Sequence, residues 1–399
     1  MDPLLNPFVP GAGAQPPELT GRRDLLEQAR IALGRTRLGR PSKSFIATGL
    51  RGTGKTVLLQ RVRAIAEADA FQTCMIEAHE HARLNDLLVP HVRRLILHLD
   101  RLGALNEQVK RALRVLKSFM SALKISYADV ELELDVSSEV GSADSGNLES
   151  DLTELLLALG RAAAAREVGV ALIVDEVQFL SVRDLGALIM ALHRTTQHTL
   201  PIVLIGAGLP QVLNLAGRSK SYAERMFEFP SVGPLCREDA RLALTAPVEK
   251  QGVSWTDAAF AKVWEDTGGY PYFVQEWGYH AWNAATGPVI TETDVVKASD
   301  VAVRQLDESF FRVRFGRLTP RERDYLRAMA ELGPGPHRSI AIAGLLGGRV
   351  QALSSYRARL IDKGMIYSPE YGDTAFSVPL FDRFLKRTMP DWAPPTAST

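Results

Sequence analysis

The sequence predicts an α/β fold: a parallel sheet, then a helical segment and a small C-terminal unit. Two observations support this prediction. Short apolar runs typical of buried strands alternate with amphipathic stretches over residues 21–235, which favours a parallel sheet covered by helices on both faces. From Arg237 to Thr286 the apolar spacing becomes helical throughout.

The composition limits the classes of protein to which the chain can belong. The 399 residues are enough for about two or three domains. Lys and Arg number 47 against 46 Asp and Glu, so the total charge implies no polyanionic partner, although a local basic patch stays possible. Cys74 and Cys236 lack metal-ligand spacing, which favours two reduced thiols. No apolar run reaches about 18 residues and the N-terminus lacks a basic n-region, so we expect a cytoplasmic protein without a membrane partner.

The expected elements follow from apolar periodicity and breaker residues. Residues 1–20, rich in Pro and Gly, predict an extended arm that does not pack. The strands expected after it are 44–48, 73–78, 170–174 and 202–205. The helices expected around them are 25–38, one from 57, 84–102, 106–123, 152–166 and 182–197.

Residues 125–150 have the character of an insertion. Val130–Val136 alternates apolar and acidic residues, which predicts a strand with one solvated face. Ser137 to Ser150 is small, polar and acidic and predicts a mobile loop.

One motif predicts a ligand. Residues 49–56 read G-x-x-x-x-G-K-T between an expected strand and an expected helix, which is the context that a phosphate-binding P-loop requires. In such a loop, backbone N–H groups at a helix N-terminus surround phosphate, Lys55 reaches the β/γ-phosphates and Thr56 binds Mg²⁺. The cofactors expected are therefore ATP and Mg²⁺. The phosphate-binding residues expected are Gly49, Arg51, Gly52, Thr53, Gly54, Lys55, Thr56 and Val57.

A pair of acids follows the third apolar strand. Asp175 is expected to hold the Mg²⁺ with Thr56, and Glu176 to orient and polarise the attacking water. The alternative, a solvated strand end, weakens because a P-loop lies upstream. Gln178 could face the nucleotide or cap the next helix.

These motifs, with the strand that ends in Gly206-Ala207-Gly208, resemble AAA+-type ATPases of the bacterial Orc1/Cdc6-like and STAND-like kinds. The resemblance covers about residues 18–290. It implies a P-loop domain over 21–235 and a helical lid over 236–300. It departs from the family at Gly206-Ala207-Gly208, where the family has a polar residue near the γ-phosphate, and Gln211 or His193 could substitute.

Four further site residues are implied by the resemblance. Gly21 and Arg22 match the short box that lies against adenine, although a plain helix cap is the alternative. Arg225 matches the arginine finger that acts on a neighbouring subunit; the alternative is a surface arginine paired with Glu224 or Glu228. Pro271 matches the G-x-P element near the base, and it also suits the first turn of a helix.

The C-terminal unit, residues 301–390 with a tail over 391–399, predicts a linker helix and a winged helix-turn-helix. Helices are expected from Thr319 to 332, over 339–346 and over 350–363, followed by a hairpin of 365–368 and 375–378. The third helix would contact double-stranded DNA. The candidate contacts are Arg349, Ser355, Arg357, Arg359 and Lys363. A protein-interaction module is the alternative.

Together these features predict a slow ATPase that couples nucleotide state to the C-terminal unit and self-associates on ATP binding. One hypothesis is a DNA-associated ATPase. The second is a STAND-like signalling or assembly switch whose winged helix contacts protein. The third is a scaffold that binds nucleotide without hydrolysing it.

Overall fold

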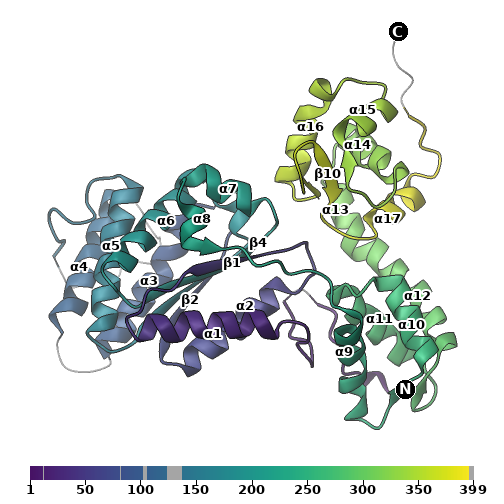
Figure 1. Ribbon diagram of the computed structural model, residues 1–399, viewed down its shortest axis with the longest axis horizontal. Coiled ribbons are helices and arrows are strands. Elements are labelled where there is room, and N and C mark those ends of the chain that lie inside the picture. The colour runs from purple at the N-terminus through teal and green to yellow at the C-terminus, as the bar shows by residue number, and fades with distance from the viewer. Residues whose placement is uncertain (12, 81, 102–105, 124–136, 395–399) are drawn as a thin grey trace. The chain divides into compact units, whose positions relative to one another are not determined.

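The computed structural model describes residues 1–11, 13–80, 82–101, 106–123 and 137–394. The chain divides into two compact units (Figure 1). The sheet unit comprises Arg22–Gly49 and Lys55–Val232. The helical unit comprises Met1–Gly21, the loop segment Leu50–Gly54 and Gly233–Thr399.

The sheet unit contains a five-stranded parallel sheet of order β2-β3-β4-β1-β5. Its strands are β1 (Ser44–Thr48), β2 (Phe71–Glu77), β3 (Gly169–Asp175), β4 (Ile202–Gly208) and β5 (Phe227–Glu228). Its helices are α1 (Arg23–Arg37), α2 (Lys55–Ala68), α3 (Leu84–Arg101), α4 (Glu107–Ala122), α5 (Leu148–Ala164), η2 (Val177–Phe179), α6 (Val182–Gln197), α7 (Val212–Ser219) and α8 (Ala223–Met226). The four predicted strands are confirmed.

Each face of the sheet has its own core because side chains alternate along a strand. Ala171 and Ile173 of β3 pack under α1 and α2. Val170, Leu172 and Val174 of the same strand pack under the helices from α3 to α7. Because β1, β3 and β4 pair in parallel, their carboxyl ends lie at the same edge of the sheet.

The structure describes only part of the predicted insertion, from residue 137 onward. Val130–Val136 lies outside the described residues. Residues 137–147 were expected as a mobile loop, but they pack: Ser142 and Ala143 are buried and Glu139 pairs with Arg111 at 2.7 Å. The helix expected at 152 begins at Leu148, where the Asn147 side chain accepts hydrogen bonds from Glu149 and Ser150 N–H groups.

The helical unit is built around one continuous core that runs from Phe8 to Leu385. Its helices are η1 (Pro3–Leu5), α9 (Arg237–Glu249), α10 (Asp257–Thr267), α11 (Pro271–Ala284), α12 (Glu292–Gln305), η3 (Leu306–Phe311), α13 (Arg312–Gly316), α14 (Pro320–Glu331), α15 (Ser339–Leu345), α16 (Val350–Asp362) and α17 (Phe381–Thr388). Its strands are β6 (Ser254–Trp255), β7 (Val289–Ile290), β8 (His337–Arg338), β9 (Ile366–Tyr367) and β10 (Asp373–Phe376).

The N-terminal arm differs from its prediction. It was expected to stay unpacked, but Phe8 is 2% exposed and its ring packs edge-on against Trp255. Asn6 donates to Tyr279 O at 2.9 Å. The arm carries an apolar residue that the glycine at 278 admits, since a Cβ there would lie 2.7 Å from the Phe8 ring.

The C-terminal segment contains the three predicted helices, α14 to α16, and a three-stranded antiparallel sheet of order β8-β10-β9. Thr319 and Glu322 form the predicted capping box at the start of α14. The short strand β8 pairs with β10 and adds a third strand to the hairpin of β9 and β10. The sequence did not predict β8.

Candidate functional site

The glycine motif forms the loop between β1 and α2. Gly52 and Gly54 have φ angles of +83° and +87°, which favour glycine. Gly49 N–H donates to Gly208 O at 3.0 Å, which ties the start of the loop to the end of β4. The ammonium group of Lys55 is buried and donates to Gly49 O at 2.9 Å. A backbone of this shape at a helix N-terminus is suited to hold phosphate oxygens.

The end of β3 lies beside the start of α2. Asp175 is 3% exposed, and its Oδ2 accepts the Thr56 hydroxyl at 2.6 Å. Its Oδ1 accepts Glu176 N–H at 2.8 Å. Burial raises the pKa of Asp175 above its ordinary value, although the Thr56 hydrogen bond opposes the shift.

These two residues form the one pair of candidate metal ligands that the sequence predicted. A hydroxyl and a carboxylate in contact offer the hard oxygen atoms that Mg²⁺ prefers. A buried carboxylate whose ionisation is penalised would be stabilised by such a cation. The residues present therefore fit a Mg²⁺–phosphate group, and Val57 lies in the first turn of α2 as expected.

Glu176 has a left-handed backbone, with φ +52° and ψ +40°. Gln178 Nε2 donates to the Glu176 carboxylate, and Gln178 Oε1 accepts Leu209 N–H at 2.9 Å. Gln178 does not cap α6, whose N-cap is Ser181; it links the Glu176 side chain to the segment after β4. His193, one candidate substitute for the missing polar residue, packs its ring against Tyr222.

The helical unit contacts the loop segment Leu50–Gly54 through residues near the predicted G-x-P element. Tyr270 OH donates to Arg51 O, and Tyr272 N–H donates to Gly52 O at 3.2 Å. Arg51 N–H donates to Ser377 O, just after β10, at 3.3 Å. Pro271 itself opens α11.

The two tyrosines beside Pro271 were not among the predicted site residues. Burial raises the pKa of the Tyr270 hydroxyl, which keeps it a neutral donor. A Cβ at residue 52 would lie 3.0 Å from Tyr270 Cε1 and 3.1 Å from Tyr272 Cβ, so glycine is needed there for space as well as conformation. Tyr270 and Tyr272 flank Pro271 in the sequence, and this aromatic pair is the signal that could have identified them as residues that contact the loop.

The two residues of the predicted adenine box belong to different units: Gly21 to the helical unit and Arg22 to the sheet unit. Gly21 has φ +66° and packs against Asp239 and Leu235 at the start of α9. Thr20 Oγ1 donates to Asp239 O at 3.0 Å. Arg22 is 7% exposed and precedes α1 in the sheet unit.

Arg225 is an exposed residue of α8. Among the residues that the structure describes, it forms no ion pair with Glu224 or Glu228; Glu228 instead accepts from the Gln28 side chain. The alternative of a locally paired arginine is therefore not what the structure contains.

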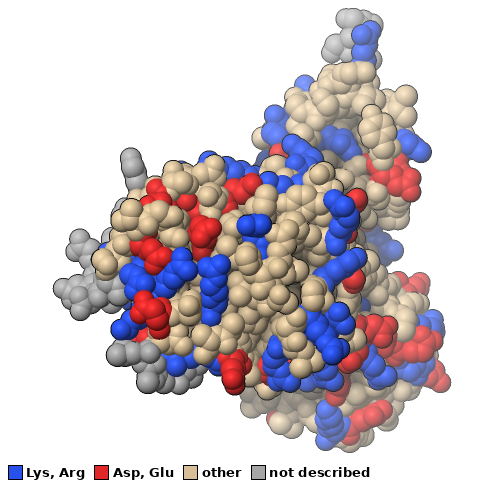
Figure 2. All heavy atoms as spheres, turned by 60° about the vertical axis from the view of Figure 1, so that its left-hand side comes forward, with Lys and Arg blue, Asp and Glu red and all other residues tan. Residues whose placement is uncertain are grey.

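On the face of the sheet unit in Figure 2, Lys and Arg are interspersed with Asp and Glu.

The candidate DNA-contacting residues of α16 divide into two groups. Arg357 donates to Thr374 Oγ1 at 3.0 Å and to Asp373 O at 2.9 Å, which fastens the helix to β10. Lys363 Nζ donates to the buried Glu322 carboxylate at 2.7 Å, and Arg359 Nε lies 3.4 Å from the same carboxylate. Arg349 and Ser355 are exposed.

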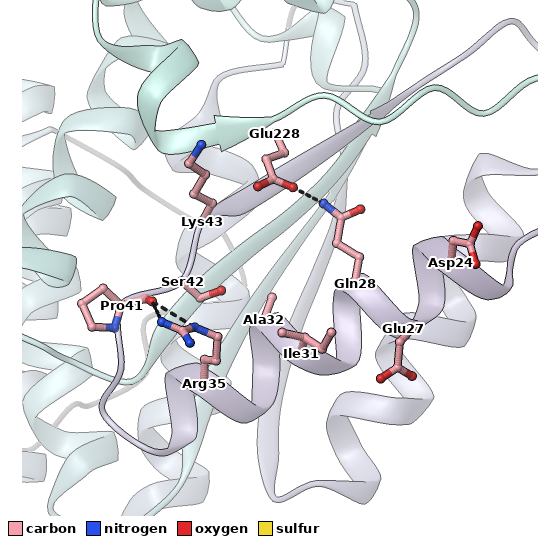
Figure 3. Close-up of a pocket in the computed structure, with 10 residues that line it drawn as sticks. All are labelled: Asp24, Glu27, Gln28, Ile31, Ala32, Arg35, Pro41, Ser42, Lys43 and Glu228. Carbon is pink, nitrogen blue, oxygen red and sulfur yellow. Dashed lines mark hydrogen bonds between the residues drawn. The ribbon is translucent and has the colours of Figure 1, made fainter.

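A groove of about 580 Å³ lies between α1 and the β1–β5 edge of the sheet (Figure 3). Its polar lining is largely satisfied within the protein: Gln28 bonds Glu228, and Arg35 donates to Pro41 O at 3.0 Å. None of the P-loop residues lines it. The groove is therefore separate from the candidate site.

In the part of the chain that the structure describes, no helix has the length and apolar character that crossing a membrane requires.

Family models match two segments of the chain. Residues 18–205 match the AAA ATPase domain family, and residues 308–385 match a domain of unknown function (DUF8462). No curated protein matches the sequence.

Solved structures also match the chain. The Walker-type ATPase of Pyrococcus abyssi has a TM-score of 0.55 at 16% identity, and the match covers 93% of this chain and 97% of that one. Cdc6p of Pyrobaculum aerophilum has a TM-score of 0.48 at 16% identity and covers 98% of each chain. The first match shows a shared fold. Residues 18–205 of this protein therefore match an AAA ATPase domain, and the chain shares the fold of a Walker-type ATPase.

Proposed function

We propose that the protein is an ATP-binding molecular switch that hydrolyses ATP slowly to ADP and phosphate. The observation that carries the proposal is the 2.6 Å contact between the Thr56 hydroxyl and the buried Asp175 carboxylate, next to the left-handed glycine loop. Backbone N–H groups of residues 49–57 would bind the phosphates with Lys55. Thr56 and Asp175 would bind Mg²⁺, which neutralises charge on the phosphate oxygens.

The reaction assigned to this site is attack of water on the γ-phosphorus. A new bond forms to the water oxygen, and the bond from phosphorus to the β,γ-bridging oxygen breaks. Glu176 accepts the proton of the water. Arg225 of a neighbouring copy would neutralise charge that develops on the γ-phosphate, so self-association on ATP binding belongs to the proposal. Gly21, Arg22 and Pro271 are proposed for the adenine side.

Turnover measurements test this mechanism. Glu176→Gln should lower kcat by about 10²-fold or more and leave ATP affinity nearly unchanged, because a general base contributes roughly 10²–10⁴-fold. Lys55→Ala should lower affinity instead. Lys43→Ala, in the separate groove beside β1, is the matched control and should behave as wild type. A Glu176→Gln variant with wild-type turnover would contradict the role of Glu176, and wild-type protein that binds ATP without turnover would support the scaffold hypothesis.

We propose that nucleotide state is coupled to the C-terminal segment through the loop Leu50–Gly54. Tyr270, Tyr272 and Ser377 all bond its backbone, so a change of the loop on phosphate binding would alter contacts of both α11 and the segment after β10. Such differential contacts are what a population shift requires.

The order of α14, β8, α15, α16, β9 and β10 supports a winged helix-turn-helix over this segment. We propose association with double-stranded DNA through the exposed Arg349 and Ser355. Arg357 and Lys363 would have to give up hydrogen bonds inside the unit to contact DNA, whereas the Arg359 side chain is 50% exposed beside Glu322 and stays a candidate contact.

One observation favours a second candidate function. Three of the five candidate contacts, Arg357, Arg359 and Lys363, already have protein partners, which suits a signalling switch whose winged helix contacts protein. DNA binding at low salt separates the two: binding that weakens steeply with salt supports the first, and its absence at 50 mM salt supports the second.

A further inference from the structure

The Gln178 side chain connects two chain segments at the carboxyl edge of the sheet. Its Nε2 donates to the Glu176 carboxylate, and its Oε1 accepts Leu209 N–H at 2.9 Å. Both ends of the amide are engaged, so its donor and acceptor have one orientation. Leu209 is the first residue after β4.

The glycine at 208 makes room for this connection. Gly208 does not have a left-handed φ, so its backbone conformation alone would accept other residues. A Cβ at that position would lie 2.7 Å from Gln178 Oε1 and 2.6 Å from Val212 Cγ2, closer than real contacts allow. The glycine therefore allows the Gln178 amide to reach the backbone after β4.

Glu176 needs such a partner. Its backbone is left-handed, outside the regular geometry of β3, and as the proposed base its carboxylate must hold one direction to orient a water molecule. A hydrogen bond from a neutral amide restrains the direction of a carboxylate without adding a charge beside it.

We propose that Gln178 is a positioning residue for ATP hydrolysis. It holds the Glu176 carboxylate toward the attacking water and ties that carboxylate to the segment after β4, so that a movement of Leu209 is transmitted to Glu176. The segment Gly206–Gly208 carries no polar side chain, and Gln178 supplies the polar group there from the β3–α6 connection. The inference rests on the proposed function.

The sharpest variant is Gln178→Glu. It keeps the length of the side chain and the acceptor for Leu209 N–H, but it replaces the amide donor with a second carboxylate oxygen beside Glu176. The control is Gln197→Glu, which makes the same change at an exposed residue at the end of α6. Single-turnover and steady-state rates, calorimetric ATP affinity and thermal melting would be measured for both.

We expect Gln178→Glu to lower kcat by about 10-fold or more, with the Kd for ATP changed less than about 3-fold and an unchanged melting temperature, because a misdirected base loses part of its roughly 10²–10⁴-fold contribution. Gln197→Glu should match wild type. Glu176→Gln combined with Gln178→Ala should be no slower than Glu176→Gln alone, since the two residues act as one unit.

Three results would overturn the inference alone while the wild type still hydrolyses ATP. They are a wild-type kcat in Gln178→Glu, additive losses in the double variant, or losses of affinity and melting temperature that parallel the loss of rate. Wild-type protein that binds neither ATP nor ADP would instead overturn the proposed function, and this inference with it.

Discussion

At the scale of single residues, burial disfavours the ionised form of the Asp175 carboxylate. Its pKa is raised mainly by desolvation, and the hydrogen bonds from Thr56 and Glu176 N–H offset this only in part. Because the folded-state pKa lies above the unfolded one, ionised Asp175 costs stability at neutral pH. The cost falls as the pH decreases through the folded pKa and is absent below about 3.9, the ordinary value for aspartate. This is a stability loss that a bound cation would remove.

We therefore predict that Asp175→Asn raises the melting temperature of the nucleotide-free protein at pH 7. The rise should be about 2–4 °C, which corresponds to roughly 1 kcal/mol in a domain of this size. It should shrink toward pH 4, and the same variant should lose the Mg²⁺-dependent stabilisation by ATP. A lower melting temperature at pH 7 would contradict this account of Asp175.

At the scale of elements, the strands were predictable and several contacts between elements were not. The runs at 44–48, 170–174 and 202–205 are apolar enough to indicate buried strands without tertiary information. β5 has two residues and β8 has two, so neither offers a periodicity to detect. The Gln178 link depends on the parallel pairing of β3 and β4, in which Val174 lies opposite Gly206, and one sequence does not state that pairing.

The site followed the same division. Thr56, Asp175 and the loop glycines were predictable because motif spacing carries them. The engagement of Arg357 and Lys363 inside the C-terminal segment was not predictable, because a charged residue on a helix looks the same whether it faces solvent or a buried partner such as Glu322. Phe8 was missed because the Pro and Gly around it indicate a loop and hide a single apolar anchor.

Phe8 provides a prediction at this scale. Replacing it with alanine should destabilise the helical unit by about 3–5 kcal/mol, the usual loss when a buried phenylalanine becomes alanine. Leu4→Ala, at a residue 92% exposed on the same arm, should change stability by less than about 0.5 kcal/mol. Urea unfolding followed by tryptophan fluorescence would measure both. Equal effects of the two changes would mean that the arm does not anchor the unit.

At the scale of the whole molecule, the loop Leu50–Gly54 is bonded by Tyr270 and Tyr272 and by Ser377, just after β10. The proposed hydrolysis needs a partner copy, and the exposed Arg225 of α8 is available to act on it because it forms no ion pair with Glu224 or Glu228 among the described residues. Turnover and assembly should therefore be linked.

We predict that Arg225→Ala lowers kcat by on the order of 10³-fold, the low end of the effect of an arginine finger. ATP affinity should change little. Mixing this variant with Glu176→Gln should restore turnover, because each supplies the group that the other lacks. Arg218→Ala, at an exposed arginine of α7, is the control. Failure of the mixture to recover activity would rule out a role in trans.

The two candidate partners of the C-terminal segment also differ at this scale. If DNA is bound, Arg349→Ala should reduce the slope of log affinity against log salt by about 1, with an unchanged melting temperature. Lys363→Ala should lower the melting temperature instead, because it leaves the buried Glu322 carboxylate without its closest cation. A loss of DNA affinity confined to Lys363→Ala would reverse this division of roles.

The most direct test is calorimetry of nucleotide-stripped wild-type protein with Mg²⁺ and either ATP or ADP, with Lys55→Ala as the matched variant. The account predicts saturable binding of one nucleotide per chain to wild type and at least about 10-fold weaker binding to Lys55→Ala. Absence of any binding heat for both nucleotides, or equal binding by the two proteins, would contradict it.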